Sequence, residues 1–131
     1  MMARLFLGLQ ALLFISYGIY CLVNPQAMAA GAGLSTTSIT GVIELQTMYG
    51  GLQVAVGAMC LLGLLRKQYE AVALHALLFI FAGLAVVRVS LGLIHGDLSG
   101  YTLFAMLYEA ACLAFLCWHL LLRRVASPVA A

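Results

Sequence analysis

Four long apolar runs dominate the sequence, and they set the strongest limit on its fold. They cover residues 5–23, 42–65, 71–94 and 101–122. A helix needs roughly 20 apolar residues to cross about 30 Å of hydrocarbon, so each run is long enough for one transmembrane helix. Of the 131 residues, 66% are hydrophobic and 8% are charged. We therefore expect an all-α membrane protein, with one domain over residues 1–131 that forms an antiparallel bundle of four transmembrane helices.

The cationic side chains predict how these helices are oriented. The connections at residues 24–41 and 95–100 contain no Lys or Arg. The opposite side, with both termini and the connection at residues 66–70, holds Arg4, Arg66, Lys67, Arg123 and Arg124. Because cytoplasmic loops carry an excess of Lys and Arg, we expect both termini to lie in the cytoplasm. The net charge of +2 is then an orientation signal, and nothing in it suggests binding to nucleic acid.

The second run begins with a polar stretch, ELQTMYGGLQ at residues 44–53. Polar groups are costly inside a bilayer unless they meet partners, so the stretch marks a packed or functional site. On a helix, two nearly opposite stripes result, one with Gln46, Gly50, Gln53, Gly57 and Cys60, the other with Glu44, Gly51, Ala55 and Ala58. Small residues on two faces allow close approach on both sides. This predicts a central helix, or one that also forms an oligomer contact.

Two further charges lie deep in the apolar runs. Arg88 precedes His95 by seven residues, which places it about 10 Å inside the third run. Glu109 follows Tyr101 by eight residues, or about 12 Å, so it lies at nearly the same depth on a neighbouring helix. Glu44 lies shallower, within the first turns of its helix. We therefore expect Glu44, Arg88 and Glu109 to form a buried ion cluster.

This cluster has a structural and a functional interpretation. It is either a clamp that fixes the register of the helices, or a ligand-binding or proton-linked site in the outer half of the bundle. Two carboxylates around one arginine leave an excess negative charge, which a shared proton or a cationic ligand would neutralise. Further hydrogen-bonding groups for such a pocket are Tyr17, Gln46, Tyr49, Gln53 and Tyr108.

The histidines offer an alternative chemistry. His75 and His119 are each roughly 6 to 8 Å from the cytoplasmic ends of neighbouring helices, so a haem or a metal would fit between them. Unclustered histidines near an interface are more often surface residues. The sequence contains no nucleophile paired with a base, no phosphate loop and no zinc motif. We therefore predict no catalytic residues, no metal and no cofactor, with haem or quinone as the alternative.

The first outer connection predicts a short helix. Asn24 would cap it, Pro25 would begin it, and Gly31 and Gly33 would end it. Such a helix is either a lid at the mouth of the bundle or a plain connector.

These motifs resemble a known family. The stretch at residues 44–53, the segment YCLVNP at residues 20–25 and the membrane Arg88 look like a bacterial family of small four-helix membrane proteins, described only as a domain of unknown function. The resemblance covers nearly the whole chain, and it implies the four-helix fold, a shared Glu44 and Arg88, and a bacterial inner membrane. More distantly, the chain resembles the DoxX and DoxD group. DoxD-type proteins are associated with quinone-linked thiosulfate oxidation, and no residue here specifies that chemistry.

Three function classes remain. The first is a protein that binds a lipid or a small amphipathic ligand in the outer polar pocket, and this is the function that we expect. The second is a noncatalytic accessory subunit that binds a larger membrane partner or forms a homo-oligomer. The third is a quinone- or haem-linked redox component. A small multidrug exporter is excluded, because its key glutamate lies in the first helix, and the first run here has no acidic residue.

Overall fold

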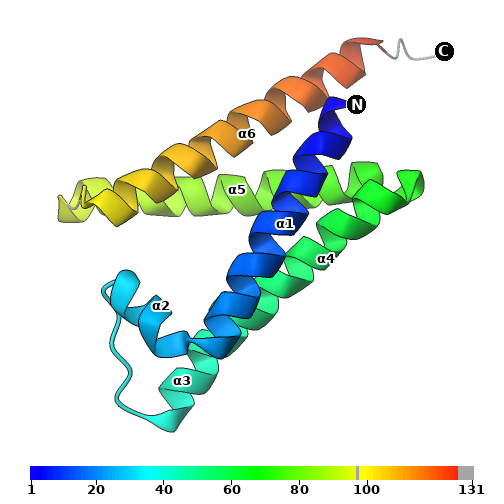
Figure 1. Ribbon diagram of the computed structural model, residues 1–131. Coiled ribbons are helices and arrows are strands. Elements are labelled where there is room, and N and C mark those ends of the chain that lie inside the picture. The colour runs from blue at the N-terminus through cyan, green and yellow to red at the C-terminus, as the bar shows by residue number, and fades with distance from the viewer. Residues whose placement is uncertain (97, 127–131) are drawn as a thin grey trace. The chain divides into compact units, whose positions relative to one another are not determined.

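The computed structural model describes residues 1–96 and 98–126, with side chains as far as residue 121. Its elements are α1 (Met2–Val23), α2 (Pro25–Gly31), α3 (Ile39–Leu45), η1 (Gln46–Gly51), α4 (Leu52–Leu65), α5 (Lys67–His95) and α6 (Gly100–Ala126) (Figure 1). Four helical spans are long and apolar enough to cross a membrane, namely Met2–Val23, Ile39–Leu65, Lys67–His95 and Gly100–Leu121. The expected all-α class with four membrane spans is therefore confirmed.

The second span begins earlier than the apolar run predicts. It starts at Ile39 rather than at residue 42, because Ser38 caps the helix. The Ser38 side-chain oxygen accepts a hydrogen bond from the Gly41 backbone N–H at 3.1 Å. This bond satisfies one of the N–H groups that have no partner within the first turn of a helix. From Ile39 the helical backbone then continues through α3, η1 and α4 to Leu65.

The connection expected at residues 66–70 is much shorter in the structure. Only Arg66 lies outside the helices, with extended backbone angles of φ −121° and ψ 108°. The third span begins at Lys67, and the Tyr69 N–H donates to the Arg66 carbonyl at 2.9 Å. The segment contains no Gly or Pro to prevent a helix. The boundary predicted from the loss of hydropathy was therefore placed about one turn too late.

The chain packs as two compact units, Met1–Ala73 and Leu74–Ala131, and α5 contributes to both. The expectation of one domain over residues 1–131 stays a prediction.

In the first unit, α1 lies antiparallel to α4 and η1 (Figure 1). The two backbones come close where glycines stand. A Cβ atom added at Gly57 would lie 2.9 Å from the Ile15 backbone nitrogen and 3.2 Å from the Ala11 carbonyl oxygen. One added at Gly18 would lie 2.9 Å from the Gly50 carbonyl oxygen. Glycine at these positions therefore allows a separation that any side chain would increase.

The two stripes predicted on the second span have different surroundings. The first is buried at Gly50, Gly57 and Cys60, and its glycines pack on α1. The second is exposed at Gly51 and at Ala58. Close approach on one face is therefore confirmed, whereas a contact of the other face with a partner stays a prediction.

The short helix α2 follows α1 as expected, with Pro25 at its first position. It ends in a Schellman turn, in which the Leu34 N–H donates to the Ala29 carbonyl at 2.8 Å across Gly33, whose φ is +70°. Asn24 precedes the helix, but within the described chain its side chain makes no capping hydrogen bond. The predicted helix is confirmed and the predicted Asn24 cap is wrong.

Candidate functional site

The second unit contains an ion pair between α5 and α6. The Arg88 Nε donates to the two carboxylate oxygens of Glu109 at 2.9 and 3.1 Å, and Nη2 lies 2.8 Å from Oε1. Two nitrogens of the guanidinium thus engage one carboxylate, the strong bidentate geometry of arginine pairs. The Glu109 side chain is 5% exposed and the Arg88 side chain 30% exposed. The carboxylate is therefore the shielded member of the pair.

The pairing follows from the regular rise of the two helices. Arg88 lies seven residues before the end of α5 at His95, and Glu109 lies nine residues after the start of α6 at Gly100. These separations correspond to about 10 and 13 Å along the helices. The predicted pairing of Arg88 with Glu109 is therefore confirmed. An arginine at such a depth would otherwise cost about 2.5 to 3.5 kcal/mol in a membrane.

Tyr108, expected to add a hydrogen bond to the site, packs by its ring. Its centroid lies 5.7 Å from that of Phe81, and the two rings meet edge to face at 78°. Phe81 is 1% exposed. This aromatic contact joins α5 and α6 through a buried face, in addition to the ion pair.

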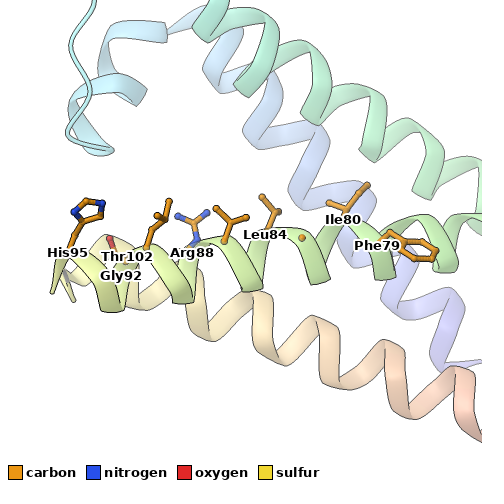
Figure 2. Close-up of a pocket in the computed structure, with 10 residues that line it drawn as sticks. Phe79, Ile80, Leu84, Arg88, Gly92, His95 and Thr102 are labelled. Atoms are coloured by element: carbon orange, nitrogen blue, oxygen red, sulfur yellow. The ribbon is translucent and has the colours of Figure 1, made fainter.

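A groove of about 870 Å³ runs along α5 beside the ion pair (Figure 2). It is lined by Phe79, Ile80, Gly83, Leu84, Val87, Arg88, Leu91, Gly92 and His95 of α5 and by Thr102 of α6. These α5 positions recur at intervals of three or four residues, so they share one face of the helix. Between Phe79 and Val87 the lining is apolar, and the polar side chains all lie beyond it. The groove therefore has one apolar end and one polar end.

Leu84, Gly92 and His95 line the groove on the same side of α5 as Arg88. Sequence reasoning did not single out the groove or Thr102, whose hydroxyl accepts a hydrogen bond from Ser99 Oγ at 3.1 Å. The signal that was available is the recurrence of apolar and small residues every three or four positions toward Arg88 and His95.

The other predicted site residues lie in the first unit. Glu44 is exposed on α3. The Gln46 Nε2 donates to the Leu22 carbonyl at 2.7 Å, so this amide joins η1 to the end of α1. The remaining three, Tyr17, Tyr49 and Gln53, are exposed or half-buried. The pairing of Glu44 with Arg88, and a common site that includes these side chains, stay predictions.

The polar stretch also contains a feature that sequence reasoning missed. Its residues Gln46–Gly51 form the π-helix η1, and the Leu52 N–H donates to the carbonyl of Thr47, five residues earlier. Single π-turns inside α-helices are often found at functional sites. The adjacent glycines Gly50 and Gly51 were the available signal, since glycine weakens the regular α-helix.

The two histidines are in different surroundings. His75 is exposed on α5, whereas the His119 ring stacks on Phe115 with centroids 5.9 Å apart and planes 6° apart. Among the residues that the structure describes, no group of three or more His, Cys, Asp or Glu side chains is placed to hold a metal ion. A haem between His75 and His119 stays a prediction.

Comparison with protein families covers both units. The model of a family described as a domain of unknown function, DUF4345, matches residues 2–121. The chain belongs to this family. The match contains all four membrane spans together with Arg88 and Glu109, so the expected family of unknown function is confirmed. The comparisons with curated proteins and with solved structures gave no match. The more distant resemblance to the DoxX and DoxD group stays a prediction.

Proposed function

We propose that this membrane protein binds a lipid or a small amphipathic ligand in the groove along α5. One observation carries the proposal, which is the polarity of the groove. The lining is apolar from Phe79 to Val87 and bears donor groups at Arg88, His95 and Thr102. An amphipathic molecule has the same division, with its chain on the apolar section and its head group beside Arg88.

The dimensions of the groove fit a chain from one leaflet. Phe79 and Val87 are eight residues apart on α5, or about 12 Å at about 1.5 Å per residue. Half of the hydrocarbon core measures about 15 Å. From Arg88 to His95 the polar section adds about 10 Å. A ligand with its head in the polar section thus has room for an extended chain of roughly one leaflet.

The head group, rather than the chain, would select this ligand from bulk lipid. Lipid tails are as apolar as leucine side chains, so moving a chain from the bilayer into the groove gains little free energy. A hydrogen bond to a charged group contributes about 1.5 to 3 kcal/mol. Arg88 is 30% exposed and is the charged side chain among the described groove residues. Selectivity is therefore expected to depend on Arg88.

Two adjacent valines provide a matched test. Val87 lines the groove and is 56% exposed, whereas Val86 lies outside the lining and is 65% exposed. The full chain is purified in lipid nanodiscs, and its retained lipids are measured by native mass spectrometry. We expect Val87→Trp to fill the groove and to lose a retained amphiphile that Val86→Trp keeps. The proposal is wrong if no amphiphile is retained by the unaltered protein, or if both variants retain it equally.

The same purification distinguishes the other two function classes. A larger membrane protein that copurifies in fixed ratio would favour an accessory subunit. A haem absorption band that is lost in both His75→Ala and His119→Ala would favour a redox component. A colourless sample that carries only the amphiphile supports the proposed ligand-binding function.

We further propose that the polar end of the groove lies at the outer face of a bacterial inner membrane, with both termini in the cytoplasm. The distribution of Lys and Arg in the sequence supports this orientation. Within the first unit, the Arg4 Nη2 donates to the Leu64 carbonyl at 2.8 Å. Leu64 is two residues before Arg66, so the cationic residues Arg4 and Arg66 lie at about the same level. The side chains of Arg123 and Arg124 lie outside the described residues. Labelling of Lys67→Cys from the outer face of intact cells, in a variant without other cysteines, would contradict the orientation.

A further inference from the structure

Building on the proposed ligand binding, we infer that the ligand carries a methyl-branched chain of the isoprenoid type rather than a straight acyl chain. A notch at Gly83, in the apolar section of the groove, would receive one of the methyl branches. The shape of the apolar section supports this chain type, whichever head group lies at the polar end.

The apolar section consists of two neighbouring rows of side chains along α5. Residues four apart lie almost one above the other on a helix and form a ridge. One row contains Phe79, Gly83 and Val87, and the adjacent row contains Ile80 and Leu84. Figure 2 shows Ile80 and Leu84 projecting from the same side of α5. Gly83 is therefore bordered by apolar side chains along its own row and along the next.

The first row is interrupted at Gly83. Its neighbours in the row, Phe79 and Val87, are 75% and 56% exposed, so they stand above the surface of the helix. Gly83 has no side chain, and within the second unit an added Cβ would meet no atom within 4 Å. Each neighbour in the row is four residues away, or about 6 Å along the helix. The notch is therefore one residue long, and its depth is that of the missing side chain.

A straight chain and a branched chain would meet this notch differently. A straight chain that lies along the row passes over the notch, and the atoms on the two sides of the gap lose dispersion contacts. A methyl branch that enters the notch restores these contacts. Branching also restricts rotation about the neighbouring bonds, as it does in β-branched side chains, so less conformational entropy is lost when the chain is ordered. Both effects favour a branched chain.

The test compares two alcohols that bind to the full chain in phosphatidylcholine nanodiscs. Phytanyl alcohol and hexadecanol have the same hydroxyl head and the same main-chain length, and only the first carries methyl branches. Their affinities are measured by native mass spectrometry over a series of alcohol concentrations. From the known effect of filling a gap of one methyl group, we expect phytanyl alcohol to bind about fivefold more tightly than hexadecanol.

One added carbon inside or outside the groove then tests the notch. Gly83→Ala places a methyl group of the protein in the notch. It should lower the affinity for phytanyl alcohol about fivefold and should not lower that for hexadecanol. Val86→Ile is the matched control, because it adds one carbon to the same helix outside the lining of the groove, at a position that is 65% exposed. It should keep the preference for the branched alcohol.

The stability of Gly83→Ala provides an independent readout. Alanine is favoured over glycine in a helix, so this variant should be at least as stable as the unaltered protein. A lost preference at full stability then results from the filled notch and not from damaged folding. A lower free energy of unfolding would mean that protein atoms occupy the notch, and it would overturn the inference.

The remaining outcomes separate this inference from the proposed function. The inference alone is wrong if hexadecanol binds as tightly as phytanyl alcohol, or if Gly83→Ala weakens both alcohols equally. It is also wrong if the amphiphile retained by the unaltered protein has a straight chain. If neither alcohol binds and no amphiphile is retained, the proposed function fails as well.

Discussion

Replacing Gly57 by alanine tests the close packing of α1 on α4. The added Cβ would lie 2.6 Å from Ile15 Cγ1, 2.9 Å from the Ile15 nitrogen and 3.2 Å from the Ala11 carbonyl oxygen. A rotation of the Ile15 side chain relieves only the first contact, because the other two atoms belong to the backbone. Ordinary contacts of a Cβ begin at 3.4 Å, so the two helices must separate by about 0.5 Å (3.4 − 2.9) at this point.

The expected cost follows from two opposing effects. Overpacking of this kind costs about 1 to 3 kcal/mol, and the backbone contacts put Gly57→Ala in the upper part of that range. Alanine is favoured over glycine in a helix by about 1 kcal/mol. We therefore expect Gly57→Ala to lower the free energy of unfolding by about 1 to 2 kcal/mol. Gly51→Ala is the matched control in the same span. A Cβ added at Gly51 would have the Gln46 carbonyl oxygen as its nearest neighbour, at 4.0 Å.

Reversible unfolding by sodium dodecyl sulfate in mixed micelles, followed by circular dichroism, measures both free energies. Thermal aggregation in nanodiscs repeats the comparison in a bilayer. Gly51→Ala should be neutral or should stabilise the protein by up to about 1 kcal/mol. If Gly57→Ala proves as stable as Gly51→Ala, the backbones of α1 and α4 do not meet at this point, and the antiparallel register of the first unit is wrong.

The polar contacts give three further predictions, measured by the same unfolding assay. Ser38→Ala removes the cap of the second span and should lower the free energy of unfolding by about 1 kcal/mol. An unchanged free energy would contradict the cap. Gln46→Leu removes the 2.7 Å hydrogen bond to the Leu22 carbonyl and should cost about 1 kcal/mol, with faster amide exchange at the end of α1. Arg88→Ala strands the buried Glu109 and should cost about 3 kcal/mol, near the lower end for a broken buried pair because Arg88 is 30% exposed. Arg88→Met combined with Glu109→Gln should recover much of that loss, and an unchanged free energy of unfolding in Arg88→Ala would contradict the pairing.

The sequence could predict the Arg88–Glu109 pair because it depends on a quantity that hardly varies. An α-helix rises about 1.5 Å per residue, so distance from a shared short connection gives depth directly. Only residues 96–99 separate α5 from α6. The same constancy explains why the length of the apolar runs located all four spans.

Features that depend on local hydrogen bonding were harder to predict. The cap at Ser38 and the break at Arg66 shifted two boundaries, because hydropathy reports burial in lipid and not where a helix can start. Likewise, the π-turn at Gln46–Gly51 changes the hydrogen-bond register without changing composition. Predicting the groove would have required knowing which side of α5 packs against α6. Phe81 lies seven residues before Arg88 on α5, which is close to two helical turns, but its ring packs against that of Tyr108.

The physical reason for having glycine at a position differs between Gly57 in the first unit and Gly83 in the second. At Gly57 a side chain would collide with the backbone of α1, so the requirement is close packing between helices. At Gly83, in the middle of α5, an added Cβ would meet no atom within 4 Å. Packing within the second unit therefore does not require glycine there, and alanine would favour the helix by about 1 kcal/mol. Gly83 does line the groove, where a methyl group would occupy space open to a ligand chain. Under the proposed function, the small residue at position 83 thus maintains the width of the groove at the expense of helix stability.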